Sequence, residues 1–429
     1  MHIFFSGIGG VGIGPLAILA KQSGLDVSGS DKQDSGYIDY LKQNGISDIH
    51  IGGQYEQINA VHQKNPIDWL VYSSAVAIEN PNSDEFRFCK EQHIRMSKRD
   101  ELINHIISQK NLKLVAIAGT HGKTTTTAMV IWLFKQLDIP VSYVVGAKLS
   151  FGEMGAYRPG SKYFVYEADE FDRNFLAFEP HLSLISGVSW DHHEIYPTRE
   201  EYQQAFKEFI DQSQRTIIWQ EDQQYLNLEP TRVIVENSSN NHINAIKLKG
   251  LYNRLDAWLA ISGAHNLFDA PVEELIGYIN RFPGLQRRME EIIPNLYSDE
   301  AHTPEKITGA MSVASEIASE KNQKVVVVFE PLTNRRQHFM LKEYKDCFNG
   351  SEKVYWLPSY LAREDPNQRV IPPSELISNL TDPGLAESQE KGPRLKSIIK
   401  NHLSHGDLVV CMSGGGGGSL DGWVRDNFK

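Results

Sequence analysis

Residues 119–124, Gly-Thr-His-Gly-Lys-Thr, carry groups suited to holding phosphate. Lys123 brings a positive charge, the hydroxyl of Thr124 can reach a Mg²⁺ ion, and the glycines let backbone N–H groups approach phosphate oxygens. The apolar run 114–118 precedes them and a segment with helical character follows. A strand, a glycine turn and a helix are the setting of a phosphate-binding loop, so we predict a nucleoside triphosphate site. Ile117 stands where the general pattern has its first glycine.

Two more groups of polar side chains follow predicted strands. Residues 167–172 hold four carboxylates after the apolar run 163–166, and such a group is costly to bury unless it is paired or bound to metal. Asp191 and His192 come after the run 182–185. Mg²⁺ prefers carboxylate oxygens beside phosphate, whereas zinc needs a third, distant ligand that the sequence does not offer. The alternatives are a solvated acidic loop and a hydrogen-bonded loop histidine.

The N-terminal segment has the features of a Rossmann-like βαβ unit. Gly7, Gly9, Gly10 and Gly12 lie between a first predicted strand and a helix, and Asp31 ends the second strand, where an acidic residue can meet a ribose. We expect a diphosphate at the start of that helix. NAD and a nucleotide sugar are both candidate ligands, and the glycines could instead serve only the packing of helix on strand.

A fourth polar group lies further along the chain. Arg287 and Arg288 follow a turn, and Asp299 ends a predicted strand. An arginine beside a triphosphate stabilises charge on the transferring phosphoryl group, and Asp299 could accept hydrogen bonds from a ribose. Because paired arginines are usually surface residues, this group alone predicts little.

Composition narrows the class of protein. A chain of 429 residues exceeds one ordinary core, so two or three domains are expected. The net charge of −11 argues against a nucleic-acid surface, and the three scattered cysteines fit a reducing cytoplasm. No apolar run reaches about 18 residues, and the N-terminus lacks the basic region of a signal peptide. We therefore expect a cytoplasmic protein without membrane or nucleic-acid partners.

The elements that must position these groups alternate along the chain. Apolar, strand-like runs alternate with helical patterns, which predicts an α/β fold with mainly parallel sheets. Further strand-like runs are residues 68–72, 216–219, 324–329 and 407–412. A helix is expected over 100–107, a break at 282–284, and surface loops over 365–373 and 382–393. The expected domains are residues 1–110, 111–283 and 284–429.

Taken in order, these motifs resemble the Mur ligase family, the ATP-dependent amide-forming ligases of peptidoglycan assembly. The resemblance runs across essentially the whole chain, and its most specific element is residues 119–126. Residues 29–31 (Gly-Ser-Asp) and 73–76 (Ser-Ser-Ala-Val) also belong to it. It implies three domains: a Rossmann-like domain for a UDP-sugar, a central ATPase domain with the phosphate loop, and a Rossmann-like C-terminal domain for the amino acid.

The resemblance also implies a reaction. ATP, with Mg²⁺, would phosphorylate the carboxylate of UDP-N-acetylmuramate, and L-alanine would attack the acyl phosphate to form an amide. Catalysis would rest mainly on positioning and charge stabilisation. The enzyme would serve wall synthesis, and with it cell shape and division, as a monomer or homodimer.

Individual roles follow from the same resemblance. The catalytic residues would be Lys123, His192 and Arg288. The ATP-binding residues would be Gly119, Thr120, Gly122, Lys123, Thr124, Thr125, Asn253, Arg288, Asp299 and His302. The UDP-sugar-binding residues would be Gly7, Gly9, Gly10, Gly12, Asp31, Ser73 and Ser74. The metal ligands would be Thr124, Glu167 and His192.

Some positions depart from the family's pattern. Gly187 and Tyr252 stand where the family has asparagine and histidine, and Leu332 and Thr333 replace His-Arg in a segment that helps bind substrate. Residues 412–415 look more like the members that use a recycled tripeptide. A peptide acceptor and a degenerate, non-catalytic nucleotide-binding relative are therefore alternatives.

Overall fold

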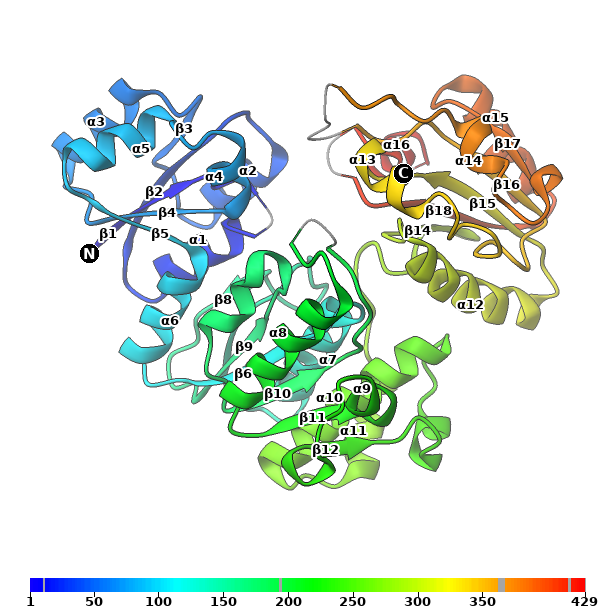
Figure 1. Ribbon diagram of the computed structural model, residues 1–429, viewed down its shortest axis with the longest axis horizontal. Helices are drawn as coiled ribbons and strands as arrows, with labels where there is room; N and C mark the ends of the chain where they lie inside the picture. Colours follow the sequence, from blue (N-terminus) through cyan, green and yellow to red (C-terminus); the bar gives the residue numbers. More distant parts are fainter. Residues whose placement is uncertain (11, 193–194, 362–366, 416–417, 429) are drawn as a thin grey trace. The chain divides into compact units, whose positions relative to one another are not determined.

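The computed structural model describes residues 1–10, 12–192, 195–361, 367–415 and 418–428 (Figure 1). They form three mainly parallel β-sheets flanked by helices, which confirms the predicted α/β class. Contacts group the chain into two compact units. The first holds residues 1–246 and 255–282, and the second holds residues 247–254 and 283–429.

The first sheet is fully parallel among its described pairs and has the order β3-β2-β1-β4-β5. The order turns back between β1 and β4, and in such sheets ligands bind at the carboxyl ends of the strands beside this point. The glycine turn directly follows β1. The strands are β1 (His2–Ser6), β2 (Asp26–Asp31), β3 (Ile49–Ile51), β4 (Trp69–Tyr72) and β5 (Arg95–Lys98). The helices are α1 (Gly14–Gln22), α2 (Gly36–Gln43), α3 (Tyr55–Lys64), α4 (Ser74–Glu79) and α5 (Asp84–Glu91).

The second sheet has the order β12-β11-β10-β6-β9-β7-β8, so β6 lies between β10 and β9. Only the β7–β8 pair is antiparallel among the pairs that the structure describes. The strands are β6 (Lys113–Ala118), β7 (Val141–Val144), β8 (Gly155–Ala156), β9 (Tyr163–Glu167), β10 (Leu182–Ile185), β11 (Thr216–Trp219) and β12 (Ile234–Glu236). Helix α6 (Arg99–Gln109) contacts β4 and β5 of the first sheet and leads into β6. The helices that follow are α7 (Lys123–Gln136), η1 (Phe171–Ala177), α8 (Arg199–Gln212), α9 (Gln220–Tyr225), η2 (Pro230–Arg232), η3 (Asn241–Ala245), α10 (Leu251–Phe268) and α11 (Val272–Ile279).

The third sheet belongs to the second unit and has the order β13-β14-β18-β15-β16-β17. Its β13–β14 pair is antiparallel, and its other described pairs are parallel. The strands are β13 (Glu290–Ile293), β14 (Leu296–Asp299), β15 (Val325–Glu330), β16 (Lys353–Trp356), β17 (Ala386–Ser388) and β18 (Leu408–Ser413). The helices are α12 (Pro304–Lys321), α13 (Asn334–Met340), α14 (Pro373–Ile377), η4 (Pro383–Leu385), α15 (Pro393–Ser404) and α16 (Leu420–Phe428).

Continuous apolar runs explain these sheets. Every residue of β10, β15 and β18 is buried, as parallel strands with helices on both faces require. The predicted strands at 68–72, 114–118, 163–166, 182–185, 216–219, 324–329 and 407–412 are all confirmed to within one residue at each end. The predicted helix over 100–107 is the middle of α6.

One predicted loop is wrong in part. The stretch 382–393 contains η4 and the short strand β17, which pairs with β16. Three residues are too few to show an alternating pattern, so β17 depends on its neighbour in the sheet. In the other stretch, residues 367–372 form no helix or strand, and residues 365–366 lie outside the described part. Among the described helices, none has the length and apolar character needed to cross a membrane.

Candidate active site

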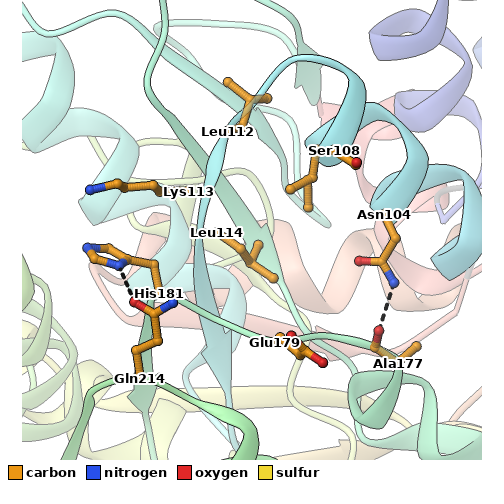
Figure 2. A pocket seen from close by; sticks show the side chains of 10 residues that line it. Asn104, Ser108, Leu112, Lys113, Leu114, Ala177, Glu179, His181 and Gln214 are labelled. Atoms are coloured by element: carbon orange, nitrogen blue, oxygen red, sulfur yellow. Dashed lines mark hydrogen bonds between the residues drawn. The ribbon is translucent and has the colours of Figure 1, made fainter.

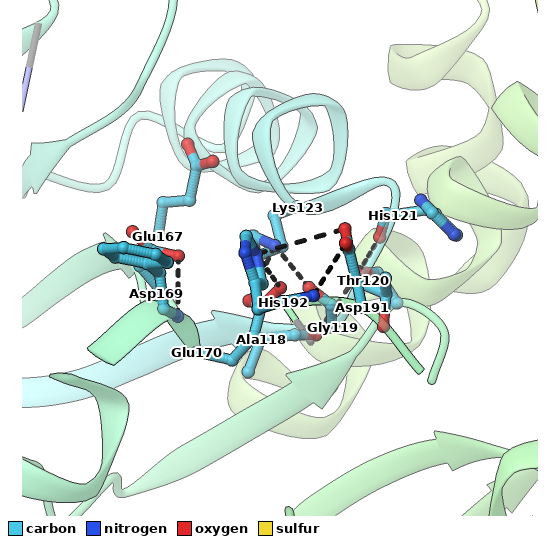
Figure 3. A network of polar contacts seen from close by, with 12 residues as sticks. Ala118, Gly119, Thr120, His121, Lys123, Glu167, Asp169, Glu170, Asp191 and His192 are labelled. Atoms are coloured by element: carbon cyan, nitrogen blue, oxygen red, sulfur yellow. Dashed lines mark hydrogen bonds and ion pairs between the residues drawn. The ribbon is translucent and has the colours of Figure 1, made fainter. Parts of the chain in front are cut away.

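Three adjacent strands bring the phosphate loop, Glu167 and His192 to one edge of the second sheet. The phosphate loop follows β6, the acidic run follows β9, and the Asp191-His192 pair follows β10. Because these strands are parallel neighbours, their carboxyl ends lie side by side. Figure 3 shows the resulting network of polar side chains.

The two glycines of the phosphate loop have no room for a side chain. A Cβ at Gly119, whose φ is +143°, would lie 2.5 Å from Ser186 Oγ. Gly122, with φ at +74°, is the residue before α7, and a Cβ there would collide with the carboxylate of Asp256. The loop therefore depends on glycine at both positions, and its shape places Lys123 at the first position of α7.

Lys123 is held by a buried carboxylate. Its ammonium donates to Glu170 Oε2 at 2.8 Å, and the Glu170 side chain is 1% exposed (Figure 3). Burial opposes both charges, but each partner favours the charge of the other: the pKa of Lys123 is raised and the pKa of Glu170 is lowered. The cation of the phosphate loop thus has a partner within the protein.

His192 lies against the same carboxylate. Its Nε2 is 3.5 Å from Glu170 Oε1, and its ring meets that of Phe171 edge to face. Burial works against protonation, but Glu170 and Asp191 outweigh it and raise the pKa of His192. Among the described residues, none donates a hydrogen bond to Glu170 Oε1, and the contact of this oxygen is the ion pair with the His192 imidazole. His192 and Lys123 therefore meet at Glu170.

Thr124 and Glu167 form the second pair of the site. The Thr124 hydroxyl donates to Glu167 Oε1 at 2.8 Å, and the Gly146 amide donates to Glu167 Oε2 at 3.0 Å. Of the three predicted metal ligands, the structure joins Thr124 to Glu167, while His192 pairs with Glu170. Within the described residues, no group of three His, Cys, Asp or Glu side chains could enclose a metal ion. This donor set suits Mg²⁺, which commonly takes one or two protein oxygens together with phosphate and water, and does not suit structural zinc.

Thr120 and Thr125 are engaged by the protein itself. The Thr120 hydroxyl donates to the backbone oxygen of Ser189 at 2.7 Å, lies 2.7 Å from the Tyr202 hydroxyl and accepts from the Ser189 amide at 2.9 Å. The Thr120 amide donates to Gly187 O at 2.7 Å. Thr125 is buried in the first turn of α7. The side chain of Thr120 thus fixes the phosphate loop to the segment that contains Ser189.

The glycine turn after β1 is also satisfied internally. The amides of Gly7 and Ile8 donate to Ser30 O, both at 2.9 Å, and the Gly9 amide donates to Asp31 Oδ2 at 2.8 Å. The Gly10 amide donates to Gly7 O at 3.1 Å. Asp31, predicted to meet a ribose, therefore also fixes the turn.

The two serines of the predicted UDP-sugar set have different roles. Ser73 precedes α4, and its hydroxyl accepts from the Val76 amide at 3.3 Å. The Ser74 hydroxyl donates to Asp172 Oδ2 at 2.9 Å, in the acidic run after β9. Ser74 therefore joins the first sheet to the loop that carries Glu170.

In the second unit, Asp299 fixes the loop that carries Arg288. Its buried carboxylate, at the end of β14, accepts from the amides of Met289 and Ala301, both at 2.8 Å. The Arg288 guanidinium pairs with Glu300. Burial alone would raise the pKa of Glu300, but the adjacent arginines lower it to about 2.

His302, also in the second unit, holds a neutral imidazole. Its Nδ1 lies 2.6 Å from Glu300 O, and its Nε2 lies 3.1 Å from Arg336 Nη1. A guanidinium only donates, so Nε2 accepts and Nδ1 carries the proton. Burial and the positive charges of Lys306 and Arg336 lower the pKa of His302 to about 3. The sequence did not predict the contact with Arg336.

The remaining predicted residue and the departures from the pattern occupy ordinary structural positions. Asn253, in α10, donates through its side-chain amide to Lys249 O at 2.8 Å, and Tyr252 beside it is 57% exposed. Thr333 caps α13 with φ at 54°. Leu332 forms an isolated bridge with Tyr360. The backbone oxygen of Gly187 accepts the hydrogen bond from the Thr120 amide described above.

Three residues near the site were not predicted as site residues. Glu170 lies within the acidic run, so its position was visible in the sequence but its pairing with Lys123 was not. Arg99 donates to Asp169 Oδ2 at 3.0 Å, and buried Glu85 accepts hydrogen bonds from Ser6 and Ser30 at the ends of β1 and β2. These partners lie far apart in the chain, and no local pattern indicates them.

A pocket of about 500 Å³ lies at the opposite end of β6 (Figure 2). Lys113 at the start of β6, Asn104 of α6, and His181 just before β10 contribute to its wall. His181 Nδ1 lies 2.8 Å from Gln214 Oε1, and this pair of side chains forms one side of the pocket. None of the predicted site residues lines this pocket, so it is separate from the phosphate loop.

Comparison with known proteins gives two family matches. Residues 2–111 match the Mur ligase family, catalytic domain, and residues 117–259 match the Mur ligase middle domain. UDP-N-acetylmuramate–L-alanine ligase of Campylobacter jejuni subsp. jejuni serotype O:6 is 30% identical over 95% of this chain and 97% of its own length. The protein of the same name from Kineococcus radiotolerans is 31% identical over 86% of this chain and 84% of its own length.

Solved structures show the same fold. UDP-N-acetylmuramate-alanine ligase MurC of Thermotoga maritima matches with a TM-score of 0.77 at 23% identity, over 97% of this chain and 96% of that one. A murein peptide ligase of Psychrobacter arcticus matches with a TM-score of 0.65 at 21% identity, over the same shares. At these identities the likeness concerns the fold.

Proposed function

The chain belongs to the Mur ligase family, and on that premise we propose that it joins L-alanine to the carboxylate of UDP-N-acetylmuramate. The reaction uses ATP and releases ADP and phosphate, with an acyl phosphate as intermediate. The observation that carries the proposal is the meeting of Lys123, Glu170 and His192 beside Thr124 and Glu167 at one sheet edge.

Lys123 is the residue best placed to act on the transferring phosphoryl group. Lys123 is the first residue of α7, and the backbone amides at a helix start can also point at a bound phosphate. We propose that phosphate oxygens take over the position of Glu170 as the partner of Lys123 when ATP binds. Fixed positive charge at that point stabilises the charge that develops during transfer.

A Mg²⁺ ion fits the Thr124–Glu167 pair. The hydroxyl and carboxylate oxygens are hard donors, and both come from the edge where the phosphates would lie. Bound there, Mg²⁺ would neutralise phosphate charge. His192, fixed by Glu170, is a further residue of this region that we propose to act near the metal.

The remaining assignments are proposals that concern the second unit. Asp299 and Glu300 hold the Arg288 loop and its guanidinium in place, which suits a residue that contacts nucleotide phosphate. Asn253 and His302 are proposed to serve the same nucleotide. His302 is neutral and accepts a hydrogen bond from Arg336, so its role would be to orient that guanidinium and not to carry charge.

We propose the domain division 1–110, 111–283 and 284–429. The first sheet ends at Lys98, the second runs from Lys113 to Glu236, and the third begins at Glu290, so each boundary falls between sheets. Residues 247–254 group with the second unit although they lie inside the proposed central domain. We also propose a cytoplasmic location, because Cys89, Cys347 and Cys411 are buried free thiols. A monomer or homodimer remains our prediction for the assembly.

L-alanine is the proposed acceptor rather than a peptide. The relatives that are about 30% identical over nearly the whole chain carry the name of the L-alanine ligase, whereas the murein peptide ligase is similar in fold at lower identity. An acceptor screen at fixed ATP, Mg²⁺ and UDP-N-acetylmuramate compares free L-alanine with the tripeptide.

The experiment that tests the function measures phosphate release. We expect release to require both UDP-N-acetylmuramate and L-alanine, and the amide product to appear in equal amount. Release without any acceptor, or none with either acceptor, would contradict the proposal. Faster turnover with the tripeptide would instead assign the chain to peptide ligation.

A further inference from the structure

Arg99 lies where the two ligand-binding regions of the first unit meet. It is the first residue of α6, directly after β5 of the first sheet. Its Nη1 is 2.6 Å from the position that a Cβ at Gly12 would take, so the guanidinium lies against the glycine turn. Its Nη2 donates to Asp169 Oδ2 at 3.0 Å, in the acidic run that follows β9 of the second sheet.

The glycine turn needs such a cation if it is to hold a diphosphate. The amides of Gly7, Ile8, Gly9 and Gly10 all donate within the fold, and those of Ile13 and Gly14 donate to Gly10 O. The acceptor for Gly9 is the carboxylate of Asp31, which adds negative charge beside the turn. A diphosphate placed against these described residues would therefore meet amides that are already engaged and one unfavourable charge, that of Asp31.

Asp169 holds the guanidinium in position. Its other carboxylate oxygen accepts from the Phe171 amide at 3.2 Å, and its backbone oxygen accepts from the Phe175 amide at 3.0 Å, so the carboxylate is fixed by its own loop. The side chains of Arg99 and Asp169 are 21% and 33% exposed. A guanidinium held on one side by a carboxylate can present its remaining N–H groups to a second anion, and its planar fork matches phosphate oxygens.

We infer that Arg99 binds the diphosphate of the sugar nucleotide beside Gly12, with Asp169 as its positioning residue. The inference rests on the proposed function, because it takes the substrate to be a UDP-sugar. It adds a charged side chain to a site for which the sequence indicated only glycines, Asp31 and two serines. A side chain at position 12 would displace the guanidinium from its place beside the turn.

The test compares UDP, UMP and UDP-N-acetylmuramate by titration calorimetry on the full chain without ATP. For Arg99→Ala we expect the Kd for UDP and for UDP-N-acetylmuramate to rise roughly 10- to 100-fold, as loss of a charge-assisted contact predicts, while UMP changes much less. Arg99→Lys should fall between, because the charge remains and the fork is lost. In the ligase assay, the KM for the sugar nucleotide should rise while the KM for ATP stays unchanged.

Arg95→Ala is the matched control. Arg95 belongs to the neighbouring β5, forms an exposed ion pair with Glu101 at 2.8 Å and covers the ring of Trp69. Its loss should leave UDP affinity as it is. Asp169→Asn should raise the Kd for UDP severalfold, because the guanidinium of Arg99 would lose the carboxylate that fixes it. If Arg99→Ala fails to fold, Asp169→Asn and Arg99→Lys still test the inference.

The outcomes separate this inference from the proposed function. If the unmodified chain does not bind UDP-N-acetylmuramate, the proposed function is wrong. If it binds, and a folded Arg99→Ala keeps the affinity for UDP, the inference alone is wrong. A loss confined to UDP-N-acetylmuramate, with UDP unaffected, would move Arg99 to the sugar acid's carboxylate and also overturn the diphosphate assignment.

Discussion

At the scale of single residues, the pairing of Lys123 with Glu170 has a direct bearing on nucleotide binding. Both side chains are largely buried, and in the proposed site the ammonium that Glu170 holds is the one that phosphate would also contact. In that case the carboxylate and ATP would compete for one ammonium. Such competition would lower the affinity for ATP, while Glu170 gives the buried cation a partner within the protein.

Glu170→Gln separates these two effects. Without ATP the variant should be less stable by about 3 kcal/mol, because Lys123 keeps its charge in a buried position without a full counter-charge. ATP should then raise its melting temperature by more than it raises that of the unmodified chain. Differential scanning fluorimetry with and without a non-hydrolysable ATP analogue measures both. Glu208→Gln, at an exposed position of α8, is the control, and a smaller ATP effect in Glu170→Gln would contradict the competition.

His302 predicts a dependence of stability on pH. Its pKa is lowered to about 3 in the fold, so between an unfolded pKa of about 6.5 and that value the unfolded chain binds the extra proton. The contribution of His302 is complete above pH ~6.5 and decreases as the pH falls. From pH 7.5 to 5.0 it should lose about 2 kcal/mol.

His302→Gln should remove that part of the acid sensitivity. Urea unfolding at pH 7.5 and pH 5.0, followed on the transition of the second unit, gives the comparison. His405→Gln, at the exposed end of α15, should keep the full pH dependence. Equal slopes for His302→Gln and the unmodified chain would show that the imidazole is not held neutral.

At the scale of elements, the phosphate loop depends on the close approach of α10 as well as on its own backbone. Gly122 has a left-handed conformation and faces Asp256 of α10 with no space for a methyl group. Gly160 has a similar φ of +84° but open space around it. The two positions separate the cost of conformation from the cost of the clash.

Gly122→Ala should therefore destabilise the chain by more than Gly160→Ala. Gly160→Ala carries the left-handed penalty of about 1–2 kcal/mol, and Gly122→Ala adds the collision with the carboxylate. Chemical denaturation of both variants measures the difference. Adding Asp256→Ala to Gly122→Ala should restore part of the loss, and equal costs at the two glycines would argue against the packing described here.

The sequence predicts the elements well and their meeting points less well. The apolar runs that end at Ala118, Tyr166 and Ile185 can be recognised because parallel strands covered on both faces are apolar throughout. No apolar run indicates the lateral order of the strands, with β6 between β9 and β10. Yet this order brings His192, which follows β10, to Glu170, which follows β9. The acidic run leaves regular structure after Glu167, and Asp172 lies at φ 55°, so no periodicity shows which carboxylate reaches Lys123.

At the scale of the whole molecule, the two predicted ligands belong to different sheets of the first unit. The glycine turn follows β1, and Lys123 follows β6. Lys123 forms its ion pair with Glu170 and Arg99 forms its own with Asp169, so a change at one proposed ligand site should leave the other nearly intact. The charge of Asp169 also helps to raise the pKa of Lys123, which is a weaker link between the two sites.

Lys123→Ala should abolish turnover, with a loss of at least roughly 100-fold, and should leave the Kd for UDP-N-acetylmuramate within roughly twofold. Phosphate release and titration calorimetry report the two quantities. Lys135→Ala is the control, because Lys135 lies near the other end of α7 and donates to Phe151 O at 2.9 Å. A large loss of sugar-nucleotide binding in Lys123→Ala would show that the two sites are not independent.

The internal hydrogen bonds of the glycine turn have a consequence for the kinetics of binding. The amides of residues 7–10 are satisfied by Ser30, Asp31 and Gly7, so these four residues have their hydrogen bonds within the protein. If the sugar nucleotide binds beside them as proposed, it does not have to order these four residues, and no such entropy cost subtracts from its affinity. Its association should then be limited by collision and orientation, with no slow first-order phase before the bound state.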